Sequence, residues 1–392
     1  MLASLFDGLP TSTPVLIGKS ALAETRVVAS IAHIGRDAWN SCFPNEIEDY
    51  DYLLAVEQAG IEGFSWRYMT IVQNERVIAA MPVFLTAYQL DTTLDEGYMR
   101  SLVRGIRRHW PGFLTLRLAC LGSPCTENGV PGFHACVTPD MRSVLLKQLL
   151  EGFKRIADAE GCALRGVKDL PDTLSADLHS VFAAGGYAAI PGLATAWLDL
   201  DFASVDDYLA RLSSGTRKDM RRKLRSRNAV TIEYRSEIAD ILPRVMELYD
   251  DTRGRSDLQF EALTGAYFAG VLRQMQGRAF CTVYKVEDRI LAINLLVHDE
   301  CTLIDKFFCM DAESGRKYNL YYLSWFNNLE YCLKHGMRRY QSGQASYESK
   351  VKLGSRLTRN TMFFRHRNPI IQTLLKFVSP MFAIDEKAET KP

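Results

Sequence analysis

One acidic residue stands inside an apolar run that has the length of a β-strand. Asp305 lies in TLIDKFFCM, where strict alternation places Leu303, Asp305 and Phe307 on one face of the strand. A carboxylate among apolar side chains loses hydration, which raises its pKa and suits it to act as a general base. The alternative is an ordinary ion pair with Arg339 or Lys306.

A second polar feature is a run of cations. TRKDMRRKLRSR holds seven Arg and Lys in twelve residues, with Asp219 as its one acid. Met220 and Leu224 give a helix a single apolar line, so its other faces, which include Arg221 and Arg222, are cationic. A solvated helix face is the alternative. The scarcity of counter-charges favours an anionic partner: a nucleotide phosphate, the phosphopantetheine of a carrier protein, or tRNA.

Two similar series of elements surround these features. In the first half, a helix precedes a hairpin that turns at Asn74 and Glu75, followed by a strand, a helix at about 139–160, a strand and a short helix ending in FAAGGY. In the second half, the hairpin turns at Glu287 and Asp288, and the Asp305 strand, a long helix, a strand and the helix YESKVKLG follow. The shared order predicts an internal duplication. Two unrelated α+β domains are the alternative.

The ends of the two halves are also predicted. The strand TAWLDLDF is expected to close the first half and the strand TRNTMFFRHR the second, and residues 204–228 are expected to form one basic helix. The boundary then lies near Phe202–Val205 and divides the chain into domains of 1–203 and 204–392.

Composition narrows the class of protein. Among 392 residues, 47 Lys and Arg balance 46 Asp and Glu to a net charge of +1, which argues against a protein that coats DNA through its overall charge. Nine cysteines without a C-x-x-C pair predict reduced thiols, and no metal is expected. No window has the roughly 18 apolar residues of a membrane span, and no signal peptide is recognised, so the expected compartment is the cytoplasm.

The order of elements resembles the GNAT acyltransferase fold, and two such halves resemble the Fem-type double-GNAT proteins. TRKDMRRKLR at Thr216–Arg225 looks like the Arg/Lys-rich helix that opens the second half in that group. SGQASYESKVKLGSRL at Ser342–Leu357 resembles its Gly-x-x-x-Tyr-x-x-Lys stretch. The resemblance implies an α+β protein of two tandem GNAT-like domains, each a mixed, mostly antiparallel sheet flanked by helices.

The resemblance implies a donor site just before the long helix. GNAT domains bind the pyrophosphate of the acyl donor on backbone N–H groups of a Gly-rich loop at a helix N-terminus. The sequence DAESGRKYN stands at that place and offers Gly315, Arg316 and Lys317. These three residues, with Arg221 and Arg222, are expected to bind the phosphates of acyl-CoA. A simple turn is the alternative.

The resemblance also identifies candidates for proton transfer. Many GNAT domains use as acid a Tyr four residues before the Gly of the last helix, and the matching positions are Phe182 and Lys350. Phe182 cannot donate a proton, so the first domain is expected to be a scaffold and the second the catalytic one. The expected catalytic residues are Asp305, Tyr347 and Lys350. The expected substrate-binding residues are Gln344 and Ser346. A packed tyrosine and a solvated helix lysine are the alternatives at Tyr347 and Lys350.

These expectations describe an N-acyltransferase that moves an acyl group from acyl-CoA, or from an acyl carrier protein, to a small-molecule or peptide amine. One alternative is an aminoacyl-tRNA-dependent transferase of the Fem type, although the basic helix is shorter than the helical hairpin that often binds tRNA in that group. The other is a noncatalytic double-GNAT protein that binds a cell-envelope or carrier-protein partner.

Overall fold

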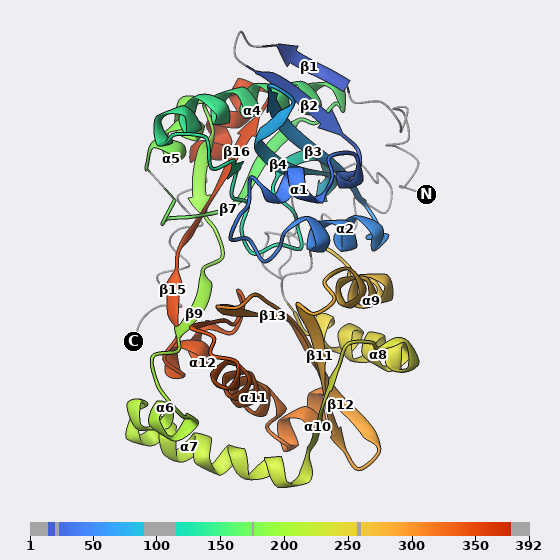
Figure 1. Cartoon of the computed structure of the whole chain (residues 1–392), viewed down its shortest axis with the longest axis vertical. Coiled ribbons are helices and arrows are strands. Elements are labelled where there is room, and N and C mark those ends of the chain that lie inside the picture. Colours follow the sequence, from blue (N-terminus) through green and yellow to red (C-terminus); the bar gives the residue numbers. More distant parts are fainter. Residues whose placement is uncertain (1–14, 20–22, 90–114, 175, 257–259, 378–392) are drawn as a thin grey trace. The chain divides into compact units, whose positions relative to one another are not determined.

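The computed structural model describes residues 15–19, 23–89, 115–174, 176–256 and 260–377. The chain packs as two compact units, each discontinuous in sequence (Figure 1). The first unit holds Met1–Tyr50, Ile61–Leu193 and Arg359–Pro392, and the second holds Asp51–Gly60 and Ala194–Thr358. Each unit is built on one mixed sheet with flanking helices, which confirms the predicted fold class.

The sheet of the first unit has the described strands in the order β1-β2-β3-β4-β5-β7-β16-β8, with the short β6 beside β4. Neighbours are antiparallel except β5 and β7, which run parallel. The strands are β1 (Val15–Lys19), β2 (Glu24–Val28), β3 (Phe64–Gln73), β4 (Arg76–Gln89), β5 (Thr115–Leu121), β6 (Gly132–Phe133), β7 (Leu164–Pro171), β8 (Ala188–Pro191) and β16 (Asn360–His366).

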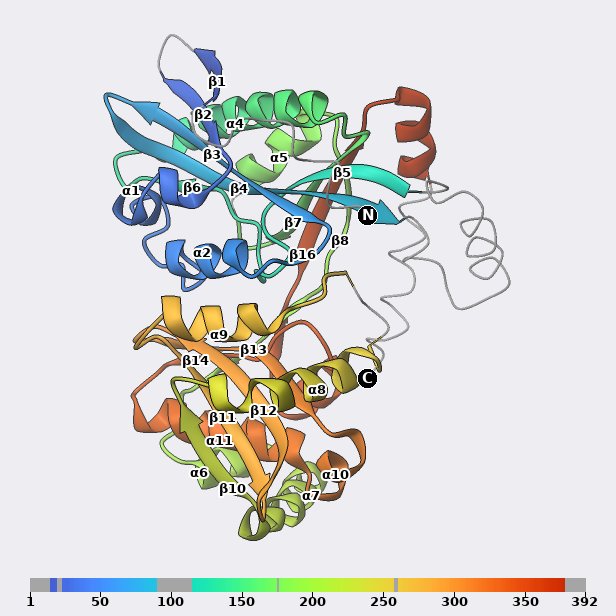
Figure 2. The same ribbon diagram turned by 90° about the vertical axis from the view of Figure 1, so that its right-hand side faces the viewer.

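Helices α4 (Pro139–Ala159) and α5 (Ala176–Ala184) cover one face of this sheet, where the main core of the first unit lies. Leu145, Leu149 and Phe153 recur on the inner side of α4 at helical spacing and pack with the apolar side chains of the strands. Figure 2 shows α4 and α5 on the same side of the sheet. The other described helices of this unit are α1 (Arg36–Asn40) and a helix at 369–377, with a 3-10 turn at Ile31–His33.

The sheet of the second unit has the described strands in the order β10-β11-β12-β13-β14-β9-β15. Here β13 and β14 are the parallel pair. Its strands are β9 (Thr195–Asp199), β10 (Thr231–Arg235), β11 (Ala279–Val286), β12 (Arg289–His298), β13 (Thr302–Met310), β14 (Arg339–Gln341) and β15 (Arg356–Thr358).

Helices cover both faces of the second sheet. Helix α11 packs on one face, and α8 and α9 pack on the other (Figure 1). The helices are α2 (Tyr50–Gln58), α6 (Val205–Arg211), α7 (Ser214–Leu224), α8 (Leu242–Arg253), α9 (Gly265–Gln274), α10 (Ala312–Lys317), α11 (Leu320–Lys334) and α12 (Tyr347–Lys352), with 3-10 turns at Arg225–Ala229 and Ala239–Ile241.

Local sequence signals explain most of these elements. Both predicted hairpins are confirmed, as β3–β4 and β11–β12. Their turn residues Asn74, Glu75 and Glu287 adopt the positive φ that a tight hairpin turn requires. The predicted single basic helix at 204–228 is wrong, because the helix is interrupted at Leu212 and Ser213. The Ser213 hydroxyl accepts a hydrogen bond from the Thr216 N–H and starts α7 as a new helix.

The final strands of the two halves are exchanged. The prediction that TAWLDLDF closes the first half is wrong, because β9 lies in the second sheet, antiparallel to β14 and β15. The prediction that TRNTMFFRHR closes the second half is also wrong, because β16 lies between β7 and β8 of the first sheet. The hydrogen bonds between strands are made by backbone N–H and C=O groups, which nearly every residue has, so either strand can pair in either sheet.

The exchange is expected to make the stability of the first unit depend on a residue near the C-terminus. Phe363 of β16 is buried and stacks on Phe182 with ring centroids 5.0 Å apart. Phe363→Ala should therefore cost about 3–5 kcal/mol. Hydrogen exchange should show lost protection in β7 and β8, whereas Phe377→Ala, which changes an exposed ring, should leave protection unchanged. Loss of protection centred on β13 and β14 instead would contradict the exchange.

Candidate functional site

The two parallel strands of the second sheet separate beside Asp305. Strand β14 pairs with β13 over three residues only, and the last matched pair is Ile304 with Gln341. Strand β13 continues through Met310 with β12 as its neighbour. Because the carboxyl ends of parallel strands are where ligands commonly bind in open sheets, this separation is a candidate site.

A β-bulge sits at the same place. Leu296 of β12 pairs with Asp305 and Leu295 pairs with Phe307, so Lys306 is an extra residue in β13. The predicted sharing of one face by Asp305 and Phe307 is therefore wrong. Asp305 turns toward α11, whereas Phe307 packs against Tyr249 of α8 on the opposite face, with ring centroids 5.2 Å apart.

The Asp305 carboxylate is held by neutral donors. Its Oδ2 accepts hydrogen bonds from the Tyr340 hydroxyl at 2.9 Å, from Asn294 Nδ2 at 3.0 Å and from Asn328 Nδ2 at 3.2 Å. Its Oδ1 accepts no hydrogen bond from any described residue. No ion pair to Asp305 forms within the described residues, so the alternative pairing with Arg339 or Lys306 is wrong.

Burial dominates the electrostatics of this group. Desolvation raises the pKa of Asp305 above its ordinary value of 3.8, and the hydrogen bonds from Asn294 and Tyr340 and the charge of Lys350 oppose that rise. Burial, and then the nearby Asp305 charge, raises the pKa of Tyr340 well above its usual value. The Tyr340 hydroxyl therefore stays protonated and remains a donor, while Asp305 is shifted toward the range that suits a base at neutral pH.

Lys350 belongs to the same cluster. It is buried on α12, and its Nζ donates to the backbone carbonyl of Ser342. The alternative of a solvated lysine is therefore wrong. Near it, at the end of β14, Gln341 Nε2 and Ser342 Oγ are buried and have no hydrogen-bond partner among the described residues. Buried polar atoms of this kind are uncommon and are available to a ligand.

The other predicted site residues of this segment lie nearby in the chain but make different contacts. The Tyr347 hydroxyl donates to the Ala194 carbonyl at 2.9 Å, so it is used in holding α12 to the start of β9. Gln344 lies in the turn after β14 and is half-buried, and Ser346 is exposed at the N-cap of α12 with a left-handed backbone. Tyr347, Gln344 and Ser346 stay predictions.

The turn expected to bind the donor phosphates is helical. Gly315 is buried within α10, where a Cβ atom would approach Met310 Sδ to 2.7 Å, so a larger residue would require the Met310 side chain to shift. The N–H of Ser314 donates to Asp311 Oδ1 at 2.8 Å, and that of Ala312 donates to Asp251 Oδ2 at 3.0 Å. Two carboxylates thus occupy N–H groups at the start of α10.

The two cations of this segment lie at the other end of α10 and take no part in the hydrogen bonds at its start. Arg316 and Lys317 are exposed in the last turn of α10, and Lys317 lies over the Tyr318 ring at 5.3 Å. An incoming phosphate would contact these two side chains, because the N–H groups of Ala312 and Ser314 are already bonded to carboxylates. Their role in donor binding stays a prediction.

The basic helix α7 keeps a cationic outer face. Met220 is buried on its inner side, and Lys223 lies over the Tyr322 ring of α11 at 3.5 Å. Arg221 and Arg222 are exposed and pair with acids at 3.9 and 2.6 Å. Lys218 of α7 and Arg225, which comes directly after the helix, are exposed and have no ion-pair partner among the described residues. An anionic partner has several accessible cations here.

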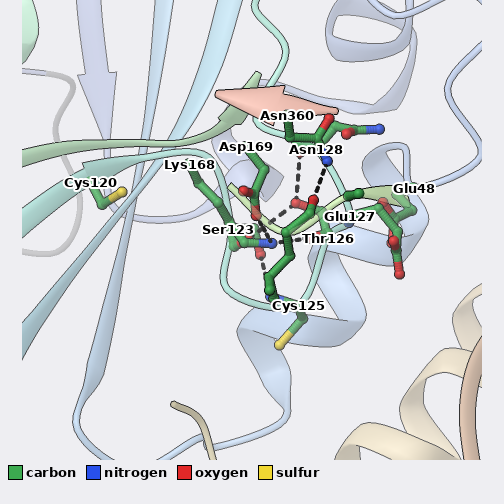
Figure 3. Close-up of polar contacts among 12 residues, drawn as sticks. Glu48, Cys120, Ser123, Cys125, Thr126, Glu127, Asn128, Lys168, Asp169 and Asn360 are labelled. Atoms are coloured by element: carbon green, nitrogen blue, oxygen red, sulfur yellow. Dashed lines mark hydrogen bonds and ion pairs between the residues drawn. The ribbon is translucent and has the colours of Figure 1, made fainter. Parts of the chain in front are cut away.

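The corresponding strand separation in the first unit is filled by its own chain. Strands β5 and β7 run parallel up to Leu121 and Val167, and their β4–β5 neighbour pair has no register shift. Figure 3 shows the next residues: Lys168 Nζ donates to the Thr126 carbonyl, and Asp169 lies beside it at 3.7 Å. A Cβ atom at Gly129 would come within 2.3 Å of the Lys168 carbonyl oxygen, so the loop fits tightly.

This loop is also tied to the rest of the first unit by hydrogen bonds. The Gly129 N–H donates to the Asp169 carbonyl, and the Glu127 N–H donates to Glu48 Oε2 at 2.9 Å (Figure 3). With neither a bulge nor room between the strands, this place lacks the features of the Asp305 site. Phe182, the first-unit match of Lys350, is fully buried in the core.

Sequence reasoning missed the three donors that hold Asp305. Asn294 lies in the apolar strand RILAINLLV and Asn328 in the apolar stretch of α11, and both are buried. An amide inside an apolar segment must find a partner, and that was the available signal. Tyr340 lies in the short polar stretch RRYQ, which gave no such signal.

The part of the chain that the structure describes holds neither a cluster of metal ligands nor a helix that could cross a bilayer. No group of three or more His, Cys, Asp or Glu side chains there is arranged to hold a metal ion. None of the helices in that part of the chain combines the length and apolar character needed to cross a bilayer. The nine cysteines are free thiols, and most are buried.

Residues 30–380 match the FemAB-like family, described as peptidoglycan biosynthesis/recognition. No curated protein sequence matches the chain. Among solved structures, FemX shares 14% identity with a TM-score of 0.53, covering 82% of this chain and 93% of FemX. At this identity the likeness shows the fold.

Two other solved structures are less similar. L-PGS from Bacillus licheniformis has 12% identity and a TM-score of 0.48, covering 77% of this chain and 86% of its own. A tandem GNAT protein from the clavulanic acid biosynthesis pathway has 13% identity and a TM-score of 0.49, covering 82% and 88%. The family match and the FemX-like fold confirm the Fem-type resemblance and support a transferase of acyl or aminoacyl groups in general.

The raised pKa of Asp305 is testable by stability alone. The pKa of such a carboxyl is near 3.8 in the unfolded protein and higher in the folded one. Its ionisation therefore lowers the stability of the folded protein. The free energy of unfolding of the wild type, relative to Asp305→Asn, should therefore fall as pH rises from about 4 through the folded pKa. Denaturant titrations at a series of pH values measure it, with the exposed Asp206→Asn as the charge-matched control. A relative stability that rises with pH would show a depressed pKa.

Proposed function

Because the chain belongs to the FemAB-like family, we propose that it transfers an aminoacyl or acyl group to an amine at the Asp305 site of the second unit. The observation that carries this proposal is the bulge at Lys306, where β13 leaves β14. It fixes Asp305 Oδ2 among three donors and leaves Oδ1 for a substrate. A positioned carboxylate with a raised pKa is the group that this chemistry needs.

The proposed step is an aminolysis in which Asp305 moves a proton. Oδ1 accepts the proton of the attacking amine as the new C–N bond forms at the donor carbonyl. The bond to the leaving oxygen or sulfur then breaks, and the leaving atom takes from Asp305 the proton that came from the amine, so that Asp305 returns to its ionised starting state. Holding the two substrates together supplies a further part of the rate.

Lys350 is proposed to act on the charge that develops in this step. A buried cation near the carbonyl stabilises the oxyanion of the tetrahedral intermediate more than it would in water. Its bond to the Ser342 carbonyl fixes the ammonium group in position. Tyr347 is retained as a second candidate for the acid that protonates the leaving group.

For the donor we propose an aminoacyl ester carried by tRNA. Two carboxylates bond to the N–H groups at the start of α10, which disfavours a pyrophosphate on those groups. The cationic face of α7, with Lys218 and Arg225 unpaired among the described residues, supports an extended polyanion instead.

Acyl-CoA, or the thioester of an acyl carrier protein, is the second candidate donor. It is favoured by the separation of β13 from β14, because the amides of a pantetheine chain bond readily to a strand edge left without its neighbour. In this case Gly315, Arg316 and Lys317, with Arg221 and Arg222, would lie along the donor phosphates.

The acceptor is proposed to be a small-molecule or peptide amine. The unpartnered Gln341 Nε2 and Ser342 Oγ, and the turn residues Gln344 and Ser346, are the proposed contacts. The free thiols support a reducing compartment such as the cytoplasm. A noncatalytic binding protein would have no use for a carboxylate kept open at Oδ1.

The catalytic assignment predicts unequal effects of mutation in the two units. Asp305→Asn and Lys350→Met should each lower turnover by about 10² or more. The wild-type rate should fall as pH drops through the raised pKa of Asp305, because a base must be ionised, and Asp305→Asn should flatten that limb. Steady-state kinetics over pH measures both. Phe182→Leu, a core change in the first unit, should alter stability by roughly 1 kcal/mol and leave turnover per folded molecule unchanged.

Tyr347→Phe tests whether Tyr347, rather than Asp305, gives the proton to the leaving group. Because its hydroxyl bonds to the Ala194 carbonyl, its loss should have less effect than Lys350→Met. An equal or larger loss of turnover would make Tyr347 the acid. Full activity in all three variants would move the chemistry away from Asp305.

The donor assignment predicts which cations matter. Replacing Arg221, Arg222 and Arg225 with Gln keeps helix propensity, so folding should survive while binding to aminoacyl-tRNA weakens. The salt dependence of binding should become shallower by about one unit per lost phosphate contact. Charge reversal at Arg316 and Lys317 should leave tRNA affinity unchanged. Calorimetry that shows CoA binding abolished by that reversal, with no RNA bound by the wild type, would establish the second candidate.

A further inference from the structure

A helix after the last strand buries a glutamine and leaves several large apolar side chains exposed. Residues 369–377 form a helix whose Gln372 is buried. Gln372 Nε2 donates to the carbonyls of Gly186 and Phe364, and its Oε1 accepts from the His366 N–H at 2.6 Å. Leu375 packs beside it on an apolar cluster of the first sheet. These contacts fix which face of the helix points outward.

The outward face is apolar. Ile370 is 78% exposed, Leu374 61% and Phe377 82%, and Ile371 beside them is 39% exposed. The spacing of 370, 374 and 377 places the three side chains in one line along the helix. These four residues account for four of the ten exposed large apolar side chains in the described part of the chain. A contiguous apolar patch of this kind marks an interaction surface.

The charge around this helix has one sign. In the sequence from Arg359 to Ile384 there are four Arg and Lys and no Asp or Glu. Arg367 is exposed just before the helix, and Lys376 lies in its last turn. A second copy of the same face would bring these cations against each other, which disfavours self-association through the patch. Anionic surfaces are complementary to it.

We propose that helix 369–377 docks the protein on an anionic lipid surface. Helices that lie in a bilayer interface place Phe, Leu and Ile among the acyl chains and Lys or Arg at the headgroups, and their affinity sums the two contributions. A helix of this length lies along the surface. The binding is peripheral and reversible, and it is independent of which donor the second unit uses.

Vesicle flotation of the full chain tests this inference. The wild type should float with phosphatidylcholine vesicles that contain about 30% phosphatidylglycerol, bind pure phosphatidylcholine less, and bind less at high salt. The variant Ile370→Ser, Leu374→Ser, Phe377→Ser should lose at least about tenfold in partitioning, since burial of one large apolar side chain is worth about that factor. The changes are on the outer face, so the thermal midpoint should be retained.

A matched control uses another exposed apolar pair of the first unit. Met141→Ser with Val144→Ser changes exposed residues of α4 and should leave vesicle binding intact. Equal partitioning of the triple variant and the wild type would overturn the proposal. So would absence of vesicle binding together with a concentration-dependent dimer, measured by ultracentrifugation, that the triple variant abolishes.

Discussion

One carboxylate oxygen holds together the elements that form the site. Asp305 Oδ2 receives donors from β12, β14 and α11, so its position depends on the packing of all three against β13. A carboxylate taken out of water without partners costs several kcal/mol, so these donors are a condition of folding as well as of function. The donors are neutral, and this matters for chemistry. A guanidinium in place of Asn294 or Tyr340 would satisfy the same oxygen but hold the carboxyl pKa low, and a carboxylate of low pKa is a poor base.

The same constraint distinguishes the two sheets. In the first sheet the antiparallel strands β1 to β5 precede the parallel strand β7, and in the second the antiparallel strands β10 to β13 precede the parallel strand β14. This shared order supports the predicted duplication. Only β12–β13 carries a bulge beside the parallel pair, whereas β4–β5 keeps a regular register. A bulge turns one side chain to the other face and weakens the ladder locally. The first sheet keeps its ladder, and the Lys168–Thr126 contact closes the space beyond it, so that sheet gains rigidity at the place where the second keeps an opening.

Local sequence patterns predicted the helices and strands, whereas contacts between distant parts of the chain could not be predicted. The hairpin turns at Asn74–Glu75 and Glu287–Asp288, helix α4 and the strand that carries Asp305 all follow from short-range periodicity and turn residues. Asp305 itself and Lys350 were found because each is a charge in an apolar or motif context. The bulge was invisible, since alternation assumes an unbroken pleat. Tyr340 and Asn328 lie 35 and 23 residues from Asp305, and the exchanged strands β9 and β16 are chosen by backbone pairing that any apolar strand satisfies.

The exchanged strand also explains how an apolar helix face comes to point outward. Strand β16 ends at His366, and the backbone N–H of that residue is bonded to Gln372, so the pairing of β16 with β7 sets the rotation of the helix that follows. Turning the helix to hide Ile370 and Phe377 would leave the buried partners of Gln372 unsatisfied, at about 1–3 kcal/mol for each group. Hydrophobic burial of two or three side chains against the first unit would be of similar size, so the amide contacts offset the free energy that would be gained by turning the apolar face inward. An exposed face that is maintained by specific hydrogen bonds, and flanked by cations alone, is better explained by a surface outside the chain than by incomplete packing within it.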